Sequence, residues 1–228
     1  MILFDGLESV RKDVSECGRK VVLVAACKTQ TKQTVDEFMV YAPEFVLGEN
    51  RVQELTSKYD SRYDWHFIGR LQTNKVKYII DKVSLIHSLD RHELACEIEK
   101  QAAKRNKVQQ CLVEVNMGAE ITKGGVSPEK VCDFIDSLEN YPHIEVKGIM
   151  SVMPNLPDAE ELHGEYARLE SLFERVRNIK TRNSDIEYLS AGMSGDYKIA
   201  LAHGANMLRL GRLLFGERPM SEYRRTQK

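Results

Sequence analysis

The 228-residue sequence lacks several features that would assign it to a functional class at first sight. Its net charge is only −1, so it has no bulk positive field of the kind that attracts nucleic acid. No hydrophobic run approaches the roughly 20 residues of a membrane-spanning helix. The N-terminal segment MILFDGLESV has acidic residues where a secretory signal peptide needs a basic flank. We therefore expect a cytoplasmic protein that binds neither nucleic acid nor membrane.

The cysteines give no framework for the fold. Their number is odd, and no two of them form a C-x-x-C pair. Scattered single cysteines argue against a disulfide framework and against a zinc site, and they fit a reducing compartment. The five are Cys17, Cys27, Cys96, Cys111 and Cys132.

Short apolar runs alternate with stretches of helical periodicity along nearly the whole chain. The eight apolar runs are VVLVAA (21–26), EFVLG (44–48), WHFIG (65–69), SLIHS (84–88), CLVEVN (111–116), IEVKGIM (144–150), IEYLS (186–190) and NMLRLG (206–211). The clearest helical stretches are LFDGLESVRKDVSECG, QTVDEFMVY, NKVKYIIDK, DRHELACEIEKQAAKRN, SPEKVCDFIDSLEN, AEELHGEYARLESLFERVRN and GDYKIALAHG. We expect the first helix to end at Gly18, and Ser127 to cap the helix in SPEK with Pro128 at its first position.

Strands separated by helices pair in parallel through right-handed crossovers. Eight such units in a chain of this length predict a (β/α)8 barrel of the TIM type, with an extra N-terminal helix and a single domain over residues 1–228. The alternative is an open doubly wound sheet, which normally carries a glycine-rich turn after its first strand. The segment ACKTQTKQT after the first run contains no glycine, which favours the barrel.

In such barrels the loops that follow the strands build the functional site. The segment YLSAGMSGDYKIA after the seventh run places two glycines and two serines before a helix, where backbone N–H groups attract a phosphate. The alternative is that Ser194 simply caps the next helix. Arg209 ends the neighbouring run, and its guanidinium suits either a phosphate or another acceptor.

The first run ends at Lys28. A lysine at the mouth of an apolar barrel, opposite a phosphate site, is placed to form a Schiff base with a phosphorylated aldehyde. Neighbouring residues of a strand point to opposite faces, so Cys27 is expected to pack against the helices as a small hydrophobe. His66 lies inside a run, and we expect it to be a hydrogen-bonded barrel residue and not a metal ligand.

Together the segments VAACKTQ, GENRVQE, WHFIGRLQTNKVK, IHSLD, VNMGAEITKGG, GIMSVMP, LSAGMSGDYKIAL and LRLGRLLFG resemble the pyridoxal-phosphate homeostasis protein family. These are pyridoxal 5′-phosphate (PLP) binding barrels related to the N-terminal domain of alanine racemase. The resemblance implies that Lys28 holds PLP as an aldimine and that Asn50, Met150 and Ser151 lie near the ring. It further implies that Ser194, Gly195 and Gly211 bind the phosphate, and that Arg209 contacts either the phosphate or the pyridine nitrogen.

The same resemblance bears on whether the protein is an enzyme. Racemases of this fold add a β-rich domain with a catalytic tyrosine, and here few residues follow LLFGER. We therefore expect a PLP carrier or regulator in vitamin B6 and amino-acid homeostasis, monomeric, with PLP-dependent apo-enzymes as candidate partners. The alternatives are an amino-acid racemase of the alanine racemase type and a PLP-independent barrel enzyme acting on a phosphorylated metabolite. The latter would lack a carboxylate pair or metal cluster for its chemistry.

Overall fold

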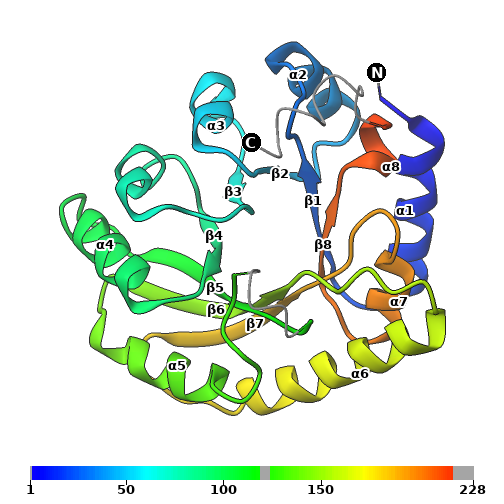
Figure 1. The fold of residues 1–228 in the computed structure, drawn as a ribbon. Coiled ribbons are helices and arrows are strands. Elements are labelled where there is room, and N and C mark those ends of the chain that lie inside the picture. Colours follow the sequence, from blue (N-terminus) through cyan, green and yellow to red (C-terminus); the bar gives the residue numbers. More distant parts are fainter. Residues whose placement is uncertain (1, 119–123, 218–228) are drawn as a thin grey trace.

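The computed structural model describes residues 2–118 and 124–217. In these residues eight parallel strands pair in chain order, and the last pairs with the first, so the sheet closes into a barrel (Figure 1). The predicted (β/α)8 fold is therefore confirmed. All eight apolar runs are strands: β1 (Val22–Ala26), β2 (Val46–Glu49), β3 (Trp65–Phe67), β4 (Leu85–Leu89), β5 (Gln109–Val115), β6 (Ile144–Ser151), β7 (Ser184–Ser190) and β8 (Met207–Leu210).

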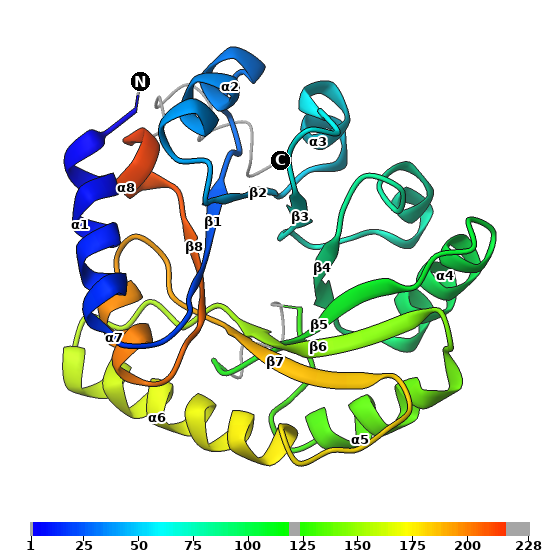
Figure 2. The ribbon, with the colours of Figure 1, turned by 180° about the vertical axis from the view of Figure 1, so that it is seen from behind.

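Helices surround the barrel on its outside (Figures 1 and 2). The first is the predicted extra N-terminal helix, and Gly18 follows it with a φ of 70°, as expected for a residue that ends a helix. The α-helices are α1 (Phe4–Glu16), α2 (Lys32–Tyr41), α3 (Val52–Lys58), α4 (His92–Ala103), α5 (Val131–Ser137), α6 (Ala159–Val176), α7 (Tyr197–Ala202) and α8 (Arg212–Phe215). Two 3-10 helices, η1 (Thr73–Tyr78) and η2 (Leu138–Asn140), complete the set in the described residues.

Two helix predictions need correction. The helix after SPEK begins at Val131, so Ser127 is not its N-cap. The reason is that Val126 still pairs with the backbone of β5, and Lys130 N donates to Ser127 O in a four-residue turn before helical bonding starts. Of the stretch NKVKYIIDK (74–82), residues 74–78 lie in the 3-10 helix η1 and residues 79–82 lie in turns. Bonds such as Ile79 N to Val76 O close these turns. Helices α3 and α8 are additions to the predicted set.

The strands separate two apolar clusters. The larger one fills the space between the strands and the helices, and it contains Cys27, which confirms the expected packing of this thiol. Burial raises the pKa of the Cys27 thiol above its ordinary value, so it stays protonated. The smaller cluster lies inside the barrel and consists of Val24, Leu85, Leu112, Met150 and Met207. Above these five side chains the barrel interior becomes polar.

Within the described residues, no helix is long and apolar enough to span a bilayer. The same part of the chain contains no group of three or more His, Cys, Asp or Glu side chains placed to hold a metal ion. All five cysteines are unpaired.

Candidate functional site

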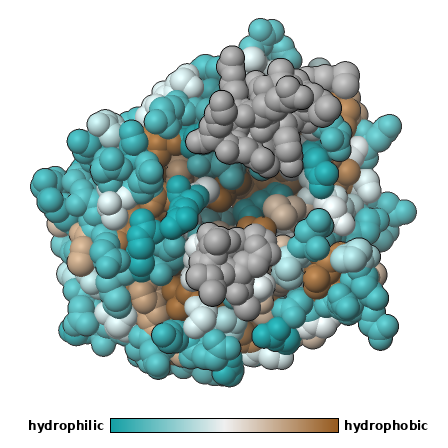
Figure 3. Space-filling view, in the orientation of Figure 1, coloured by the Kyte–Doolittle hydropathy of each residue, from teal (hydrophilic) through white to brown (hydrophobic). Residues whose placement is uncertain are grey.

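The carboxyl ends of the eight strands meet at one mouth of the barrel, as parallel strands in a closed sheet require. Figure 3 shows a hollow in the centre of that view, with hydrophobic residues visible in it and a mainly hydrophilic surface around it. Lys28 lies two residues beyond β1 in a turn and is half-buried. The next residue, Thr29, has a φ of 68°, which is rare for a β-branched side chain. The turn that carries Lys28 is thus a strained one.

A group of largely buried charges from β2 and α3 holds this turn. The ammonium group of Lys58 donates to Cys27 O at 2.8 Å, on the N-terminal side of Lys28. Glu54 Oε2 accepts from Thr29 N at 2.7 Å, on the C-terminal side, and lies 3.4 Å from Lys58 Nζ. Both peptide groups that flank Lys28 are therefore fixed by α3.

The third member of this group is Glu49, at the end of β2. Its carboxylate pairs with Lys58, and the two side chains are 0% and 6% exposed. Its Oε2 also accepts from Asn50 N at 3.1 Å, so the group fixes the backbone of Asn50 as well. Burial raises the pKa of Glu49, and the neighbouring Lys58 opposes that rise. We call Glu49, Glu54 and Lys58 the outer network.

A second polar group lies inside the barrel and links β3, β4, β7 and β8. His66 Nδ1 and His87 Nε2 are 3.0 Å apart, and His87 Nδ1 lies 3.3 Å from Ser190 Oγ. Arg209 donates to Ser190 Oγ at 2.7 Å and to Ser190 O at 2.8 Å. We call His66, His87, Ser190 and Arg209 the inner network. The expectation that His66 is a hydrogen-bonded barrel residue is confirmed.

Burial decides the charge state of the inner network. It lowers the pKa of His66 to about 4 and holds that of His87 well below its usual range, so both imidazoles are neutral at neutral pH. Burial also lowers the pKa of Arg209, but a guanidinium remains protonated in proteins. Of the four side chains of the inner network, Arg209 is thus the one that stays charged, at the end of β8.

The loops after β7 and β8 meet through Ser194. Its Oγ accepts from Gly211 N at 3.2 Å and from Leu213 N at 3.1 Å. The hydroxyl therefore caps the first turn of α8 and not that of α7, the next helix. This bond brings Ser194, Gly195 and Gly211 together, and a Cβ added at Gly211 would lie only 3.5 Å from Ala26 Cβ at the end of β1.

A brace beneath the loop keeps Ser194 in place. Asp196 Oδ1 accepts from Met193 N at 2.6 Å, which closes the loop on itself. Tyr166 from α6 donates to Asp196 Oδ2 at 2.7 Å and ties the loop to the helical layer.

Two of the expected residues lie deeper in the wall. Met150 belongs to the apolar cluster inside the barrel. Ser151 is fully buried, and its hydroxyl donates to Val115 O at 2.9 Å. What Ser151 presents to the interior is its carbonyl oxygen, which accepts from Arg209 at 2.8 Å.

Glu114 is a partly buried carboxyl that the sequence motifs did not indicate. It lies two residues after Leu112 on β5, so it shares the interior face with that residue. Its Oε2 has no hydrogen-bond partner in the described parts of the chain. Burial and the nearby Asp90 raise the pKa of Glu114 to about 7. The two networks could not be predicted from the sequence either, since only the tertiary fold shows that these side chains are buried.

Comparison with known proteins gives the family. The family model described as alanine racemase, N-terminal domain, matches residues 18–219. A pyridoxal phosphate homeostasis protein of Aquifex aeolicus is 43% identical over 219 residues, covering 93% of this chain and 95% of that protein. Its counterpart in Vibrio alginolyticus is 32% identical over 223 residues, covering 93% and 94%. The chain belongs to the pyridoxal phosphate homeostasis protein family.

Solved structures agree with this family. PipY of Synechococcus elongatus, solved without PLP, superposes with a TM-score of 0.82 at 27% identity, covering 93% of this chain and 99% of that one. PipY with PLP bound gives a TM-score of 0.77 at 26% identity over the same shares. An alanine racemase of Clostridium difficile shares the fold at 14% identity and a TM-score of 0.73, with 97% of this chain matching 62% of that one. The resemblance of this homeostasis-family chain to PLP-binding barrels is thus confirmed over nearly its whole length. Of the resembling segment VNMGAEITKGG, residues 119–123 lie outside the described residues.

Proposed function

We propose that this protein binds PLP at the barrel mouth, holds it covalently on Lys28, and acts as a carrier or regulator of PLP without turnover. One observation carries the proposal: the outer network fixes the backbone on both sides of Lys28 and at Asn50. Placing charged groups out of contact with water behind the turn of Lys28 costs free energy of folding. A site that needs the amine of Lys28 at one position explains why the outer network is present. That PipY has been solved with PLP bound supports the binding of PLP.

The residues present fit the parts of the cofactor. Lys28 supplies the amine that condenses with the aldehyde, with loss of one water. Ser194 accepts two N–H bonds through its oxygen, which leaves its single hydrogen to donate to a phosphate oxygen. Gly195 and Gly211 leave room for the phosphate, and a Cβ at Gly195 would lie 3.7 Å from the guanidinium of Arg212. Asn50 lines a cavity beside β3 and has its backbone held by Glu49, and we assign its side chain to the ring.

Arg209 is assigned to the pyridine nitrogen and not to the phosphate. Its guanidinium is held inside the barrel by Ser190 and by the carbonyl of Ser151, whereas the phosphate residues belong to the loops after β7 and β8. A guanidinium keeps its proton, so it donates a hydrogen bond to the ring nitrogen without protonating it. PLP supplies an electron sink for carbanions when that nitrogen is protonated, and here the sink is weak. A carrier without turnover needs no such sink.

The proposed function also implies a location, an oligomeric state and partners. We place the protein in the cytoplasm as one barrel domain, monomeric, with PLP-dependent apo-enzymes as recipients of the cofactor. The names of its relatives as homeostasis proteins support a role without catalysis.

A spectroscopic titration tests the proposal. Adding PLP to the full chain should give a saturable absorption band of a protonated imine, and the Lys28→Ala variant should lack it. Lys32→Ala is the matched control, because Lys32 lies four residues away and pairs with Asp36 at the surface. An equal band in all three proteins would refute the assignment of Lys28. Exchange of the α-proton of alanine in heavy water, scaling with protein concentration, would instead support the racemase alternative.

A further inference from the structure

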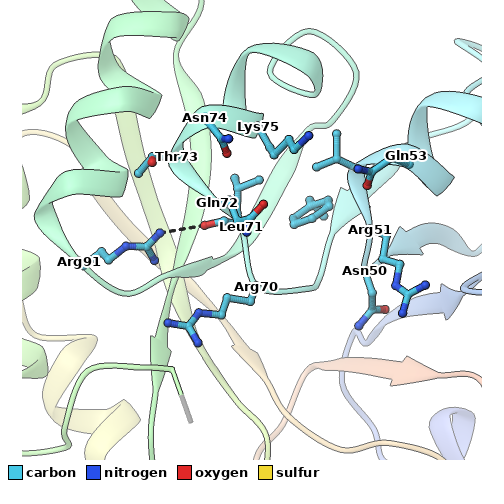
Figure 4. Close-up of a pocket in the computed structure, with 12 residues that line it drawn as sticks. Asn50, Arg51, Gln53, Arg70, Leu71, Gln72, Thr73, Asn74, Lys75 and Arg91 are labelled. Atoms are coloured by element: carbon cyan, nitrogen blue, oxygen red, sulfur yellow. Dashed lines mark hydrogen bonds between the residues drawn. The ribbon is translucent and has the colours of Figure 1, made fainter. Parts of the chain in front are cut away.

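A cavity of about 620 Å³ lies beside the barrel mouth, between α3 and η1 (Figure 4). This volume lies in the range of cavities that hold a small molecule. Its inner wall is apolar and includes Val52, Phe67 and Leu71, which belong to the core cluster outside the strands. The cavity is therefore a side pocket of the rim, outside the barrel interior.

The charged residues that line this cavity are all basic. Its lining includes four basic residues and no carboxylate (Arg51, Arg70, Lys75 and Arg91). In Figure 4 these four come from different sides of the opening, with Lys75 above, Arg70 below, and Arg91 and Arg51 to either side. The remaining polar lining consists of amides and one hydroxyl (Asn50, Gln53, Gln72, Thr73 and Asn74). Amides and basic groups together suit oxygen-rich anions.

Two of the basic residues are already oriented by the protein. Arg91 pairs with Asp90 and donates to Leu71 O at 3.0 Å, which fixes its guanidinium at the edge of the cavity. Arg51 lies 3.8 Å from Glu54 of the outer network. The ammonium group of Lys75 lies over the face of Tyr78, 5.7 Å from the centre of the ring. A ligand would therefore meet partly preorganised groups at one end and a long adaptable side chain at the other.

This cavity is distinct from the proposed phosphate loops. It adjoins β3, whereas the phosphate loops follow β7 and β8, which lie across the eight-stranded barrel. The two places share one residue, since Asn50 lines the cavity and is assigned to the cofactor site. Asn50 Oδ1 is buried and has no hydrogen-bond partner in the described part of the chain, so it awaits a donor.

We propose that this cavity is a second ligand site, which takes a small anion with phosphate or carboxylate groups on Arg51, Arg70 and Lys75 and its apolar body against Phe67 and Leu71. The site goes beyond the proposed PLP function. Asn50 lines this cavity and is also assigned to the PLP site, so a coupling between the two sites rests on the proposed function, and it would be reciprocal.

The test measures binding of two probes, inorganic phosphate and succinate, by isothermal titration at constant ionic strength. The two probes separate a phosphate ligand from a carboxylate ligand. The protein is the full-length Lys28→Ala variant without PLP, so the result does not depend on the covalent proposal. We expect saturable binding of at least one probe, weakened about tenfold by Arg70→Gln and by Lys75→Gln, the effect of losing one charged hydrogen bond.

Lys77→Gln is the matched control. Lys77 lies on the same 3-10 helix and also contacts Tyr78, but it does not line the cavity. Its substitution should change the affinity less than twofold. Ser194→Ala separates the two anion sites, since binding of phosphate at the loops after β7 and β8 would weaken in that variant and not in Arg70→Gln. The proposal is overturned if neither probe binds saturably, if Lys77→Gln weakens binding as much as Lys75→Gln, or if only Ser194→Ala weakens it.

Discussion

The outer and inner networks flank the same barrel mouth but are built differently. The outer network pairs one buried cation with two carboxylates, and its remaining bonds go to the backbone at Cys27, Thr29 and Asn50. The inner network surrounds Arg209 with a hydroxyl, two carbonyl oxygens and, beyond them, two neutral imidazoles. In the outer network the carboxylates compensate the charge of Lys58, and the network positions the backbone. In the inner network the acceptors around Arg209 are neutral, so its positive charge stays available to a ligand. The first network fixes the backbone on both sides of Lys28, and the second holds a positive charge at the end of β8.

Lys58→Met should break the outer network with the largest effect. Removing the cation leaves Glu49 buried without its partner, which costs about 3–5 kcal/mol of unfolding free energy. Urea unfolding measures it, with Lys12→Met as the control at an exposed helical ion pair. Loss of Lys58 also raises the pKa of Glu49 further, so the deficit should shrink as the pH falls and the carboxyl becomes neutral. A deficit that grows in acid would contradict this role of Glu49.

Glu114→Gln should stabilise the protein at alkaline pH. The pKa of Glu114 is raised to about 7, so the folded state loses stability as the pH rises from about 4.5 through 7. Removing the ionisable group should raise the free energy of unfolding by on the order of 3 kcal/mol at pH 8 and change it little at pH 4.5. Urea unfolding at both values measures the difference. An unchanged pH profile would mean that this carboxyl finds a partner in solution.

His66→Asn tests the effect of burial on the inner network. An unfolded histidine takes up a proton near pH 6.5, whereas buried His66 does so only near pH 4. The stability present above pH 6.5 is therefore lost as the pH falls towards 4, at about 1.4 kcal/mol per pH unit for each such histidine. The variant should unfold with a slope shallower by about that amount. His143→Asn is the control, since His143 is partly exposed and pairs with Glu99. An equal change of slope in both variants would contradict the claim that burial of His66 causes the pH dependence.

Tyr166→Phe should have the smallest effect and should weaken phosphate binding at the Ser194 loop. The substitution removes the bond to Asp196 that braces this loop, at a cost of about 1–2 kcal/mol. We expect a several-fold loss of PLP affinity without loss of the imine band. Tyr78→Phe, at an exposed ring, should leave PLP affinity unchanged. If both variants bind PLP as tightly as the wild type, the brace is structural only.

The alternation of apolar runs and helical stretches was enough to predict the barrel, because each strand of a closed parallel sheet is buried and bounded by polar loop residues. The outward position of Cys27 followed from the same alternation. The start of α5 could not be predicted, because the pairing of Val126 with β5 delays the helix and leaves no local signal. The Ser194 loop was recognised as polar, but its cap on α8 depends on a contact with residues 17 and 19 positions away.

The networks were hidden from sequence for a different reason. Glu54 and Lys58 have the spacing of an ordinary surface pair on a helix, and nothing local shows that Lys58 turns inward to Glu49 and Cys27 O. Likewise His66 and His87 lie 21 residues apart, on β3 and β4, and only the pairing of these two strands brings the imidazoles together.

The most direct test of the account is to trap the cofactor on the chain. The purified protein, saturated with PLP, would be reduced with borohydride, digested and mapped by mass spectrometry. The account predicts one stable adduct, on the peptide containing Lys28, and its yield should fall in Lys58→Met because the turn is then no longer held. An adduct spread over several lysines, or confined to one other than Lys28, would contradict it.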